Sequence, residues 1–255
     1  MRVLQILDVD ISQLRQIVRP TKFQNIVLPD ESFFCYPNSA TRFFTDEYRE
    51  TVERIKNYAQ KNFTPLEDKK YYFFHGIHQF GEERVAKYFE SKGYKIILPF
   101  NIDLDTELNI LANCESFAST LGSCAHNMIF MKENSQAIFI PRSCYLTDYQ
   151  NALNDFQDME ITYIDSTLSL FQPENGGPFC YIISDRLKKF FGDECTGEYS
   201  DEDFIIFLNY LKYATVKNFP PSDKTQKYYE PILPEFYAQL KSRTDLLEKF
   251  GVTLK

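Results

Sequence analysis

Short apolar runs alternate with amphipathic stretches between residues 70 and 164. The runs predict strands, because few polar side chains interrupt them, at Lys70–His75, Lys95–Pro99, Cys114–Ser119, Gln136–Ile140 and Glu160–Ile164. Apolar residues recur at helical spacing between the runs, which predicts helices at Gly81–Lys92, Asp105–Ala112 and Tyr145–Phe156, with a helix or turn at His126–Met131. This alternation with short connections predicts an α/β fold, a parallel sheet with helices on both faces.

The chain before residue 70 has a different rhythm. Apolar runs at Val3–Leu7 and Asn25–Leu28 lie between polar turns and prolines, which predicts short strands and loops. Thr45 precedes two acidic residues and can cap a helix whose apolar side continues to Ala59. Residues 62–70 are polar and are expected to form a linker. We therefore expect residues 1–66 to be a short N-terminal α/β segment.

The chain after residue 165 is expected to be mainly helical. Pro178–Lys189 is read as a strand and a helix, or as one helix entered at Pro178. Asp201–Ala214 is a strong helical pattern, Pro220-Pro221 breaks it, and Pro234–Phe250 is expected to form one amphipathic helix. We accordingly divide the rest of the chain into a nucleotide-binding domain at 67–220 and a C-terminal segment at 221–255 that packs back on the body.

Composition and charge narrow the function classes. The formal net charge is −8, so binding to a phosphate backbone is not expected and no nucleic-acid partner is predicted. Six cysteines stand at irregular spacing, and the N-terminus carries acidic residues and no secretory signal pattern. We expect free thiols and a cytoplasmic protein, with docking at the inner face of a membrane left open. The scattered histidines and cysteines lack zinc spacing, so no metal is expected.

A run of small residues from Ala118 to Ala125 leads into His126 and Asn127. Small side chains at a strand end let a ligand approach the backbone, and a helix start offers free amide groups, which together suit a phosphate. Close packing of a helix on the sheet explains the same residues and is the commoner reason for such small side chains. Motifs of P-loop, dinucleotide-binding and serine-hydrolase proteins are absent from the sequence.

Three blocks resemble the C-terminal half of glycosyltransferase family 61, whose bacterial members are associated with capsule and surface polysaccharide synthesis. They read YYFFHGIHQFGEERVAKYFESKGYKIILP, DLDTELNILANCESFASTLGS and AHNMIFMKENSQAIFIPR, and residues 24–62 resemble the segment that precedes this half. The resemblance implies a GT-B-like fold, a nucleotide-sugar donor, inversion at the anomeric carbon, and no cofactor or required metal. It departs from the family where His75 replaces an arginine found in many relatives.

The candidate site residues lie where the predicted strands end. Residues considered for acid–base catalysis are His75, His126 and Asp165. Residues considered for contacts with the donor are His78, Glu83, Arg84, Ser119, Thr120, Gly122, Ser123, Asn127 and Arg142. Each also has a structural interpretation, as a polar loop, a helix start, a packing residue, a helix cap or a surface ion pair.

These observations favour an inverting glycosyltransferase that moves a sugar from a nucleotide-sugar to a glycan acceptor. The region before residue 70 is short for a full acceptor domain, so the acceptor side is expected to be reduced or completed by a partner transferase. The alternative is a non-catalytic module that keeps the fold and binds a glycan or a partner. A phosphate-ester hydrolase would need an Asp-rich metal cluster that the sequence lacks.

Overall fold

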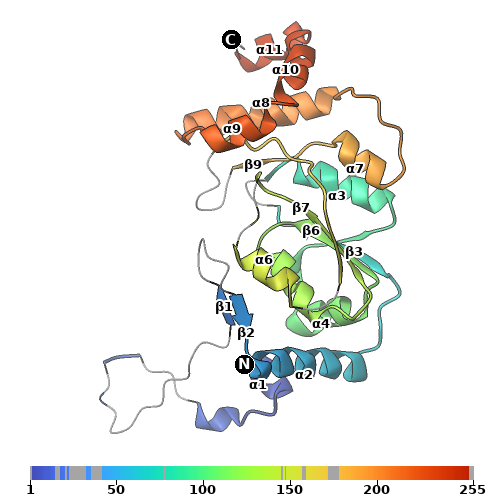
Figure 1. The fold of residues 1–255 in the computed structure, drawn as a ribbon, viewed down its shortest axis with the longest axis vertical. Coiled ribbons are helices and arrows are strands. Elements are labelled where there is room, and N and C mark those ends of the chain that lie inside the picture. The colour runs from blue at the N-terminus through green and yellow to red at the C-terminus, as the bar shows by residue number, and fades with distance from the viewer. Residues whose placement is uncertain are drawn as a thin grey trace.

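The centre of the molecule is a five-stranded parallel sheet (Figure 1). The computed structural model describes residues 2–14, 18–20, 22, 33–35, 42–76, 79–144, 146, 148–156, 159–171 and 178–252. The strands lie in the order β5-β3-β6-β7-β8 and comprise β3 (Lys70–Phe73), β5 (Lys95–Ile97), β6 (Ser116–Thr120), β7 (Gln136–Ile140) and β8 (Glu160–Tyr163). The predicted parallel sheet is therefore confirmed, with strand ends within a few residues of those expected.

Helices cover both faces of this sheet, which makes the fold Rossmann-like. Tyr72 and Ala118 point to the face that packs against α3 (Glu82–Ser91) and α7 (Asp185–Phe190). Phe73 and Phe117 point to the other face, because successive side chains alternate along a strand. Four helical elements lie on this second face: α4 (Leu104–Asn113), α5 (Ser123–His126), η3 (Asn127–Phe130) and α6 (Asp148–Asn154). A short 3₁₀ turn, η2 (Pro99–Asn101), precedes α4.

The N-terminal part lies at the lower end of the molecule in Figure 1. Its elements are α1 (Arg2–Ile6), η1 (Ile11–Gln13), an antiparallel pair of β1 (Phe33–Cys35) and β2 (Arg42–Phe44), and α2 (Asp46–Asn62). The Thr45 hydroxyl caps α2 by accepting from the amide of Tyr48 at 3.2 Å, as predicted. Ile55 and Ala59 of α2 are buried against Leu108 of α4.

The strand predicted at Val3–Leu7 is wrong, because these residues form helix α1. The run holds Leu and Gln, which favour helices, and Ile6 packs into the cluster between α2 and α4. Arg2 then pairs with Asp105 at 2.8 Å, which holds α1 on α4. The strand expected at 25–28 lies outside the described residues.

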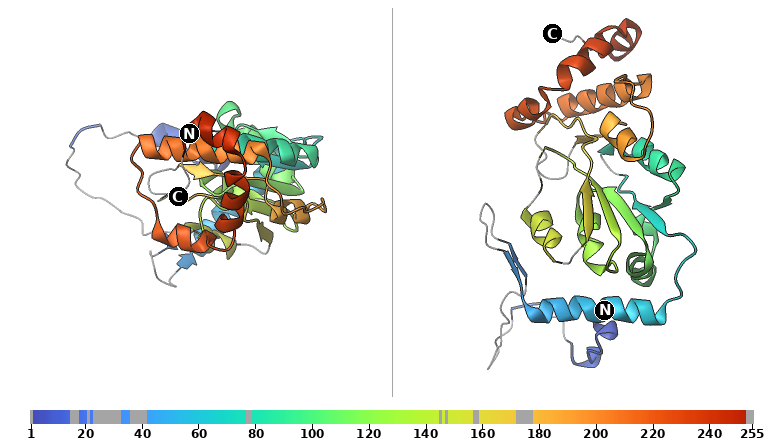
Figure 2. Two further views of the ribbon diagram at one scale, coloured as in Figure 1. Left: turned by 90° about the horizontal axis from the view of Figure 1, so that it is seen from above. Right: turned by 45° about the vertical axis from the view of Figure 1, so that its right-hand side comes forward.

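The C-terminal part is a helical body at the upper end of Figure 1, and Figure 2 shows it from two further sides. A short parallel pair joins it to the sheet region, with β4 (Gln79–Phe80) beside β9 (Phe179–Cys180). The remaining elements are α8 (Asp201–Val216), α9 (Asp223–Tyr229), α10 (Leu233–Lys241) and α11 (Thr244–Phe250). Buried residues of α8, α10 and α11 share one core cluster with Leu168 and Cys180.

Two details of this part differ from the sequence predictions. The single helix expected at Pro234–Phe250 is wrong, because the chain divides at Ser242 and Arg243 into α10 and α11. Arg243 leaves the helical path and pairs with Asp201 and Asp245. No helix in the described ranges is long and apolar enough to cross a bilayer. The cysteines with described side chains, Cys114, Cys124, Cys144, Cys180 and Cys195, are unbridged.

Candidate functional site

The strand order creates a crevice position between β3 and β6. The chain leaves β3 toward β5 at one edge of the sheet, and leaves β6 toward β7 in the opposite direction. Open parallel sheets bind ligands at such a point, beyond the carboxyl ends of the strands. His75 follows β3 and Thr120 ends β6, so both stand at this position. The sequence predicted each of them at a strand end, and the structure brings the two side chains into contact.

His75, Thr120 and Glu82 form a hydrogen-bonded chain. The Nδ1 atom of His75 lies 3.1 Å from the Thr120 hydroxyl, which lies 3.0 Å from Oε1 of Glu82. The Glu82 carboxylate is fully buried and also accepts from the backbone amides of His75 at 3.1 Å and of Gly76 at 2.9 Å. It stands in the first turn of α3, where a carboxylate is favoured by the helix dipole.

The contacts of Thr120 couple the tautomer of His75 to the charge of Glu82. When the Glu82 carboxylate is ionised it only accepts hydrogen bonds, so the Thr120 hydroxyl donates to Glu82. The Thr120 oxygen then accepts from Nδ1–H of His75, and Nε2 is the unprotonated nitrogen of the ring. The His75 side chain retains 13% exposure. The geometry therefore suits His75 as a general base that acts through Nε2.

A second cluster surrounds Arg142, which follows β7. A Cβ atom added to Gly122 would lie less than 3 Å from the Arg142 guanidinium, so the small residue makes room for this side chain. The guanidinium lies 5.2 Å from the centre of the Phe179 ring, and its buried Nε atom has no hydrogen-bond partner among the residues that the structure describes. Within the described part of the chain, no carboxylate forms an ion pair with Arg142. The cation is therefore positioned for a ligand that carries negative charge.

Tyr181 connects the two clusters. Its hydroxyl donates to Oε1 of Gln79 at 2.6 Å and lies near the side chains of Thr120 and Arg142. The ring is fully buried, and this burial raises the pKa of Tyr181 above its usual value. Tyr181 stays neutral and supplies a fixed dipole between the histidine chain and the cation.

The charge of Arg142 also acts on His126. Burial, together with the positive charge of Arg142, lowers the pKa of His126 below its ordinary value. His126 is therefore neutral near pH 7 and offers both a donor and an acceptor. It ends α5, a single turn followed by the 3₁₀ turn η3. The helix start expected after Gly122 is therefore present but short, and the helix or turn expected at 126–131 is the 3₁₀ turn η3.

Other predicted residues serve the fold. Glu83 pairs with Lys87 at the surface, 2.8 Å apart, and Arg84 pairs with Asp203 and Glu202 of α8. The Asn127 side chain donates to Glu107 at 2.7 Å, where burial raises the pKa of the Glu107 carboxyl.

Two predicted serines also stand apart from the clusters. Ser119 is buried on the opposite face of β6 from Thr120, and its hydroxyl makes no hydrogen bond within the described ranges. Ser123 is exposed at the start of α5, and His78 lies outside the described residues.

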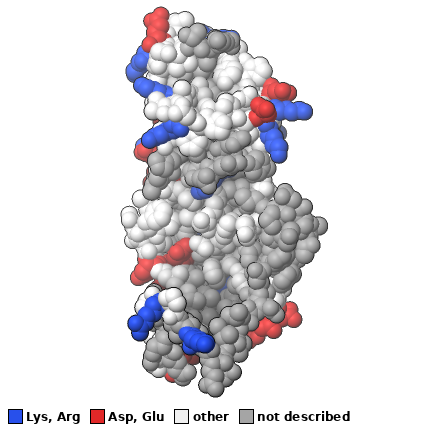
Figure 3. Space-filling view, turned by 90° about the vertical axis from the view of Figure 1, so that its left-hand side faces the viewer, with Lys and Arg blue, Asp and Glu red and all other residues white. Residues whose placement is uncertain are grey.

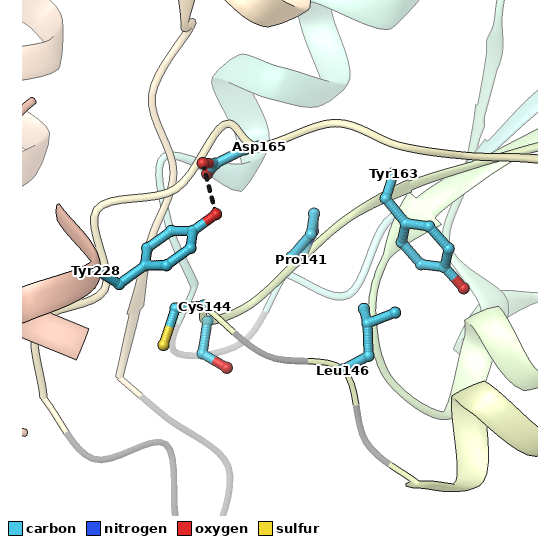
Figure 4. Close-up of a pocket in the computed structure, with 7 residues that line it drawn as sticks. Pro141, Cys144, Leu146, Tyr163, Asp165 and Tyr228 are labelled. Carbon is cyan, nitrogen blue, oxygen red and sulfur yellow. Dashed lines mark hydrogen bonds between the residues drawn. The ribbon is translucent and has the colours of Figure 1, made fainter. Parts of the chain in front are cut away.

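Asp165 lies just beyond β8, at the edge of a separate hollow. Its carboxylate accepts from Arg186 of α7 and, at 3.0 Å, from the hydroxyl of Tyr228 of α9 (Figure 4). The sequence placed Asp165 at a strand end correctly, and the structure adds the two residues that hold it. Strand β8 lies three strands away from β3 in the sheet, so Asp165 is apart from the hydrogen-bonded His75, Thr120 and Glu82.

Several site residues had no usable signal in the sequence. Glu82 falls in the first turn of the helix predicted at Gly81–Lys92, and its burial depends on the fold of the loop at 74–76. Phe179 and Tyr181 come from a segment 100 residues away from β4, so only the pairing of β4 with β9 places them here. The described residues contain no group of three or more metal-ligating side chains.

Comparison with known proteins adds no family to this picture. No family model and no curated protein matches the chain.

Proposed function

We propose that this protein is an inverting glycosyltransferase that uses a nucleotide-sugar donor. The observation that carries the proposal is the contiguous arrangement of His75, Thr120, Tyr181 and Arg142 at the crevice of the sheet. It pairs a candidate base with a cation that forms no ion pair within the described part of the chain. A direct displacement at an anomeric carbon needs these two functions, and the resemblance to glycosyltransferase family 61 supplies the reaction class.

The reaction divides between the two clusters. Nε2 of His75 takes the proton of an acceptor hydroxyl, whose oxygen attacks the anomeric carbon as the bond to the diphosphate breaks. Negative charge grows on the departing diphosphate, and the Arg142 guanidinium stabilises it in a partly buried setting. Neutral His126 can donate a further hydrogen bond to the same group. Glu82 acts through Thr120 as a positioning residue, and it stabilises the imidazolium that forms.

Figure 3 shows one face of the molecule, on which the coloured Lys, Arg, Asp and Glu side chains lie in small separate groups and form no broad basic patch among the described residues. The net charge of −8 would otherwise oppose an anionic donor. The single guanidinium of Arg142 beside the neutral side chains of Tyr181 and His126 acts at short range, which favours a local site over a broad basic surface.

The N-terminal part bears on how an acceptor would be bound. The described residues before 67 form helices and a two-stranded antiparallel sheet, and include no second parallel sheet. A GT-B-like arrangement would then take its acceptor side from a partner protein, or this chain would be a module that binds a glycan or a partner without turnover. Turnover separates the two functions.

The test measures initial rates with UDP-, GDP-, CDP- and CMP-sugars, a glycan acceptor and a chelator. We expect turnover that survives the chelator, falls about 10²–10⁴-fold in His75→Ala and falls about 10²–10³-fold in Arg142→Gln. Arg54→Gln, an exposed arginine of α2, is the matched control and should keep full activity. Binding of a glycan with no turnover of any donor would favour the module, and a reaction stopped by the chelator would contradict the mechanism.

A further inference from the structure

Glu107 is a half-buried carboxylate of α4 that has no part in the reaction described above. The acidic residues before it are engaged at the start of the helix. Asp103 caps α4 by accepting from the amide of Thr106 at 2.8 Å, and Asp105 pairs with Arg2 at 2.8 Å. Glu107 forms no ion pair within the described ranges. The stabilisation that acidic residues give to a helix start is therefore supplied without Glu107.

The carboxylate of Glu107 has one oxygen engaged and one open. Oε1 accepts from Nδ2 of Asn127 at 2.7 Å, while Oε2 has no hydrogen-bond partner among the described residues. Burial raises the pKa of Glu107, and the hydrogen bond from Asn127 favours its charged form. An ionised carboxylate accepts hydrogen bonds only, so the open oxygen suits a ligand group that donates, such as a hydroxyl. It would repel a second carboxylate in the same place.

The topology places Glu107 on the same side of Arg142 as His75. Helix α4 runs from β5 to β6 and crosses the second face of the sheet below β3, which lies between these strands. Its amino end follows β5, so Glu107 lies near the carboxyl ends of the strands, where His75 follows β3. Arg142 follows β7, on the far side of β6 from β3.

The thiol of Cys124 connects these groups electrostatically. Burial raises the pKa of Cys124 to about 11, and the charges of Glu107, Arg142 and Glu82 all act on this thiol. The thiol is therefore neutral, and the three charged side chains belong to one region at the edge of the sheet. Glu107 thus adds a second carboxylate to this region, beside the cation and the hydrogen-bonded His75, Thr120 and Glu82.

These positions orient a nucleotide-sugar. With its diphosphate at Arg142 and its anomeric carbon before Nε2 of His75, the sugar lies on the β3 side of the guanidinium, which is the side of Glu107. We infer that the open oxygen of Glu107 accepts a hydrogen bond from a hydroxyl group of this sugar, and that the donor carries a neutral sugar and not a sugar acid. The inference rests on the proposed function, since it assigns the sugar of that donor. Asn127 is the positioning residue that holds the carboxylate.

The experiment is calorimetry with pairs of donors that differ by one carboxylate. The pairs are UDP-glucose with UDP-glucuronate, UDP-galactose with UDP-galacturonate, and GDP-mannose with GDP-mannuronate, and inorganic pyrophosphate is the probe for Arg142. A pH of about 8 keeps Glu107 ionised, since it is far above the ordinary glutamate pKa of about 4.3. For the pair that binds best, we expect the neutral member to bind about tenfold tighter or more, the effect of one hydrogen bond to a charged group.

Two variants assign the preference to one residue. Glu107→Gln keeps a carbonyl oxygen for Asn127 and removes the charge, so it should abolish the preference without weakening the binding of pyrophosphate. Glu90→Gln removes the same charge from an exposed position at the C-terminal end of α3. It should retain the preference, which makes it the matched control.

Each outcome decides between the two proposals. Equal affinity of the wild-type protein for neutral and acidic members overturns the inference without any variant, so a folding defect in Glu107→Gln cannot protect it. A preference that survives in Glu107→Gln arises elsewhere in the protein and also overturns it. Turnover with CMP-sialic acid, whose sugar is an acid, as the preferred donor would support the transferase and overturn the neutral sugar. If neither pyrophosphate nor any nucleotide-sugar binds, both proposals fail together.

Discussion

At the scale of single residues, Gly122 and Arg142 depend on each other. Gly122 has φ 153° and leaves less than 3 Å between an added Cβ atom and the guanidinium, so any side chain there displaces the cation. The displacement is measurable without a substrate, because the charge of Arg142 helps to lower the pKa of His126. The chain has three histidines, so their ring signals can be followed individually by NMR.

We predict that Gly122→Ala raises the pKa of His126 toward its ordinary value, because a displaced cation no longer disfavours the imidazolium. Arg142→Gln should give the same upward direction. The measurement is an NMR titration of the histidine ring signals between pH 4 and pH 8.

The control is Gly93→Ala, another glycine with positive φ but with no atom within 4 Å of an added Cβ. It carries the same kind of backbone strain and should leave His126 unchanged. An equal shift in both alanine variants would show that strain, and not Arg142, controls this histidine.

At the scale of elements, Arg84 connects α3 to α8. Its partner Asp203 is 2% exposed and also accepts from the amides of Ile183, at 3.2 Å, and of Ser200, at 3.0 Å. Breaking a buried pair from one side costs about 3–5 kcal/mol, and Arg84 remains 21% exposed. We predict that Arg84→Gln lowers the free energy of unfolding by about 2–4 kcal/mol in urea denaturation, while the affinity for pyrophosphate stays unchanged.

The matched control is Lys87→Gln, because the pair of Lys87 with Glu83 is exposed on both sides. Exposed pairs contribute about 0–1 kcal/mol, so this variant should be close to wild type. A loss of pyrophosphate affinity in Arg84→Gln at full stability would return Arg84 to the ligand site.

The elements also show how far sequence patterns reach. Apolar runs and helical spacing predicted the sheet, because both signals are local and the strands are buried on two faces. The run at Val3–Leu7 carries no such local signal, since a short apolar segment can form a helix or a strand. Its packing on α4 determines that it is a helix. The sequence left Arg84 between a phosphate contact and a surface position, because its partner Asp203 lies 119 residues away.

The candidate site follows the same rule. Strand ends predicted the positions of His75 and Thr120, and parallel pairing brought them together. The contact of Glu82 with both residues depends on side-chain packing below a loop, and Tyr181 arrives from a distant segment. Such contacts leave no periodic trace in one sequence.

At the scale of the whole molecule, the C-terminal helices are packed onto the sheet region through α8. Phe236 of α10 is fully buried against the rings of Phe204 at 5.2 Å and Phe207 at 5.0 Å, both in α8. Helix α8 packs in turn on β4 and β9. We predict that Phe236→Ala lowers the free energy of unfolding by about 3–5 kcal/mol in a single transition that includes the sheet, followed in urea by circular dichroism.

Phe100→Ala provides the comparison, since Phe100 is 74% exposed and its loss should change stability little. Two separate transitions, with only one of them shifted in Phe236→Ala, would mean that the helical body unfolds independently of the sheet.

The pairing of β4 with β9 has a consequence for synthesis of the chain. These strands are separated by 100 residues, as the register of Gln79 with Phe179 shows. Ribosomes add about 5–20 residues per second, so roughly 5–20 s pass between the emergence of the two strands. During this interval Tyr181 is not yet present beside β4 and the loop at 74–76. The apolar residues that later contact α8 also stay uncovered. The crevice is thus completed late in translation, and nascent chains that pause after β8 are exposed to chaperones at this edge.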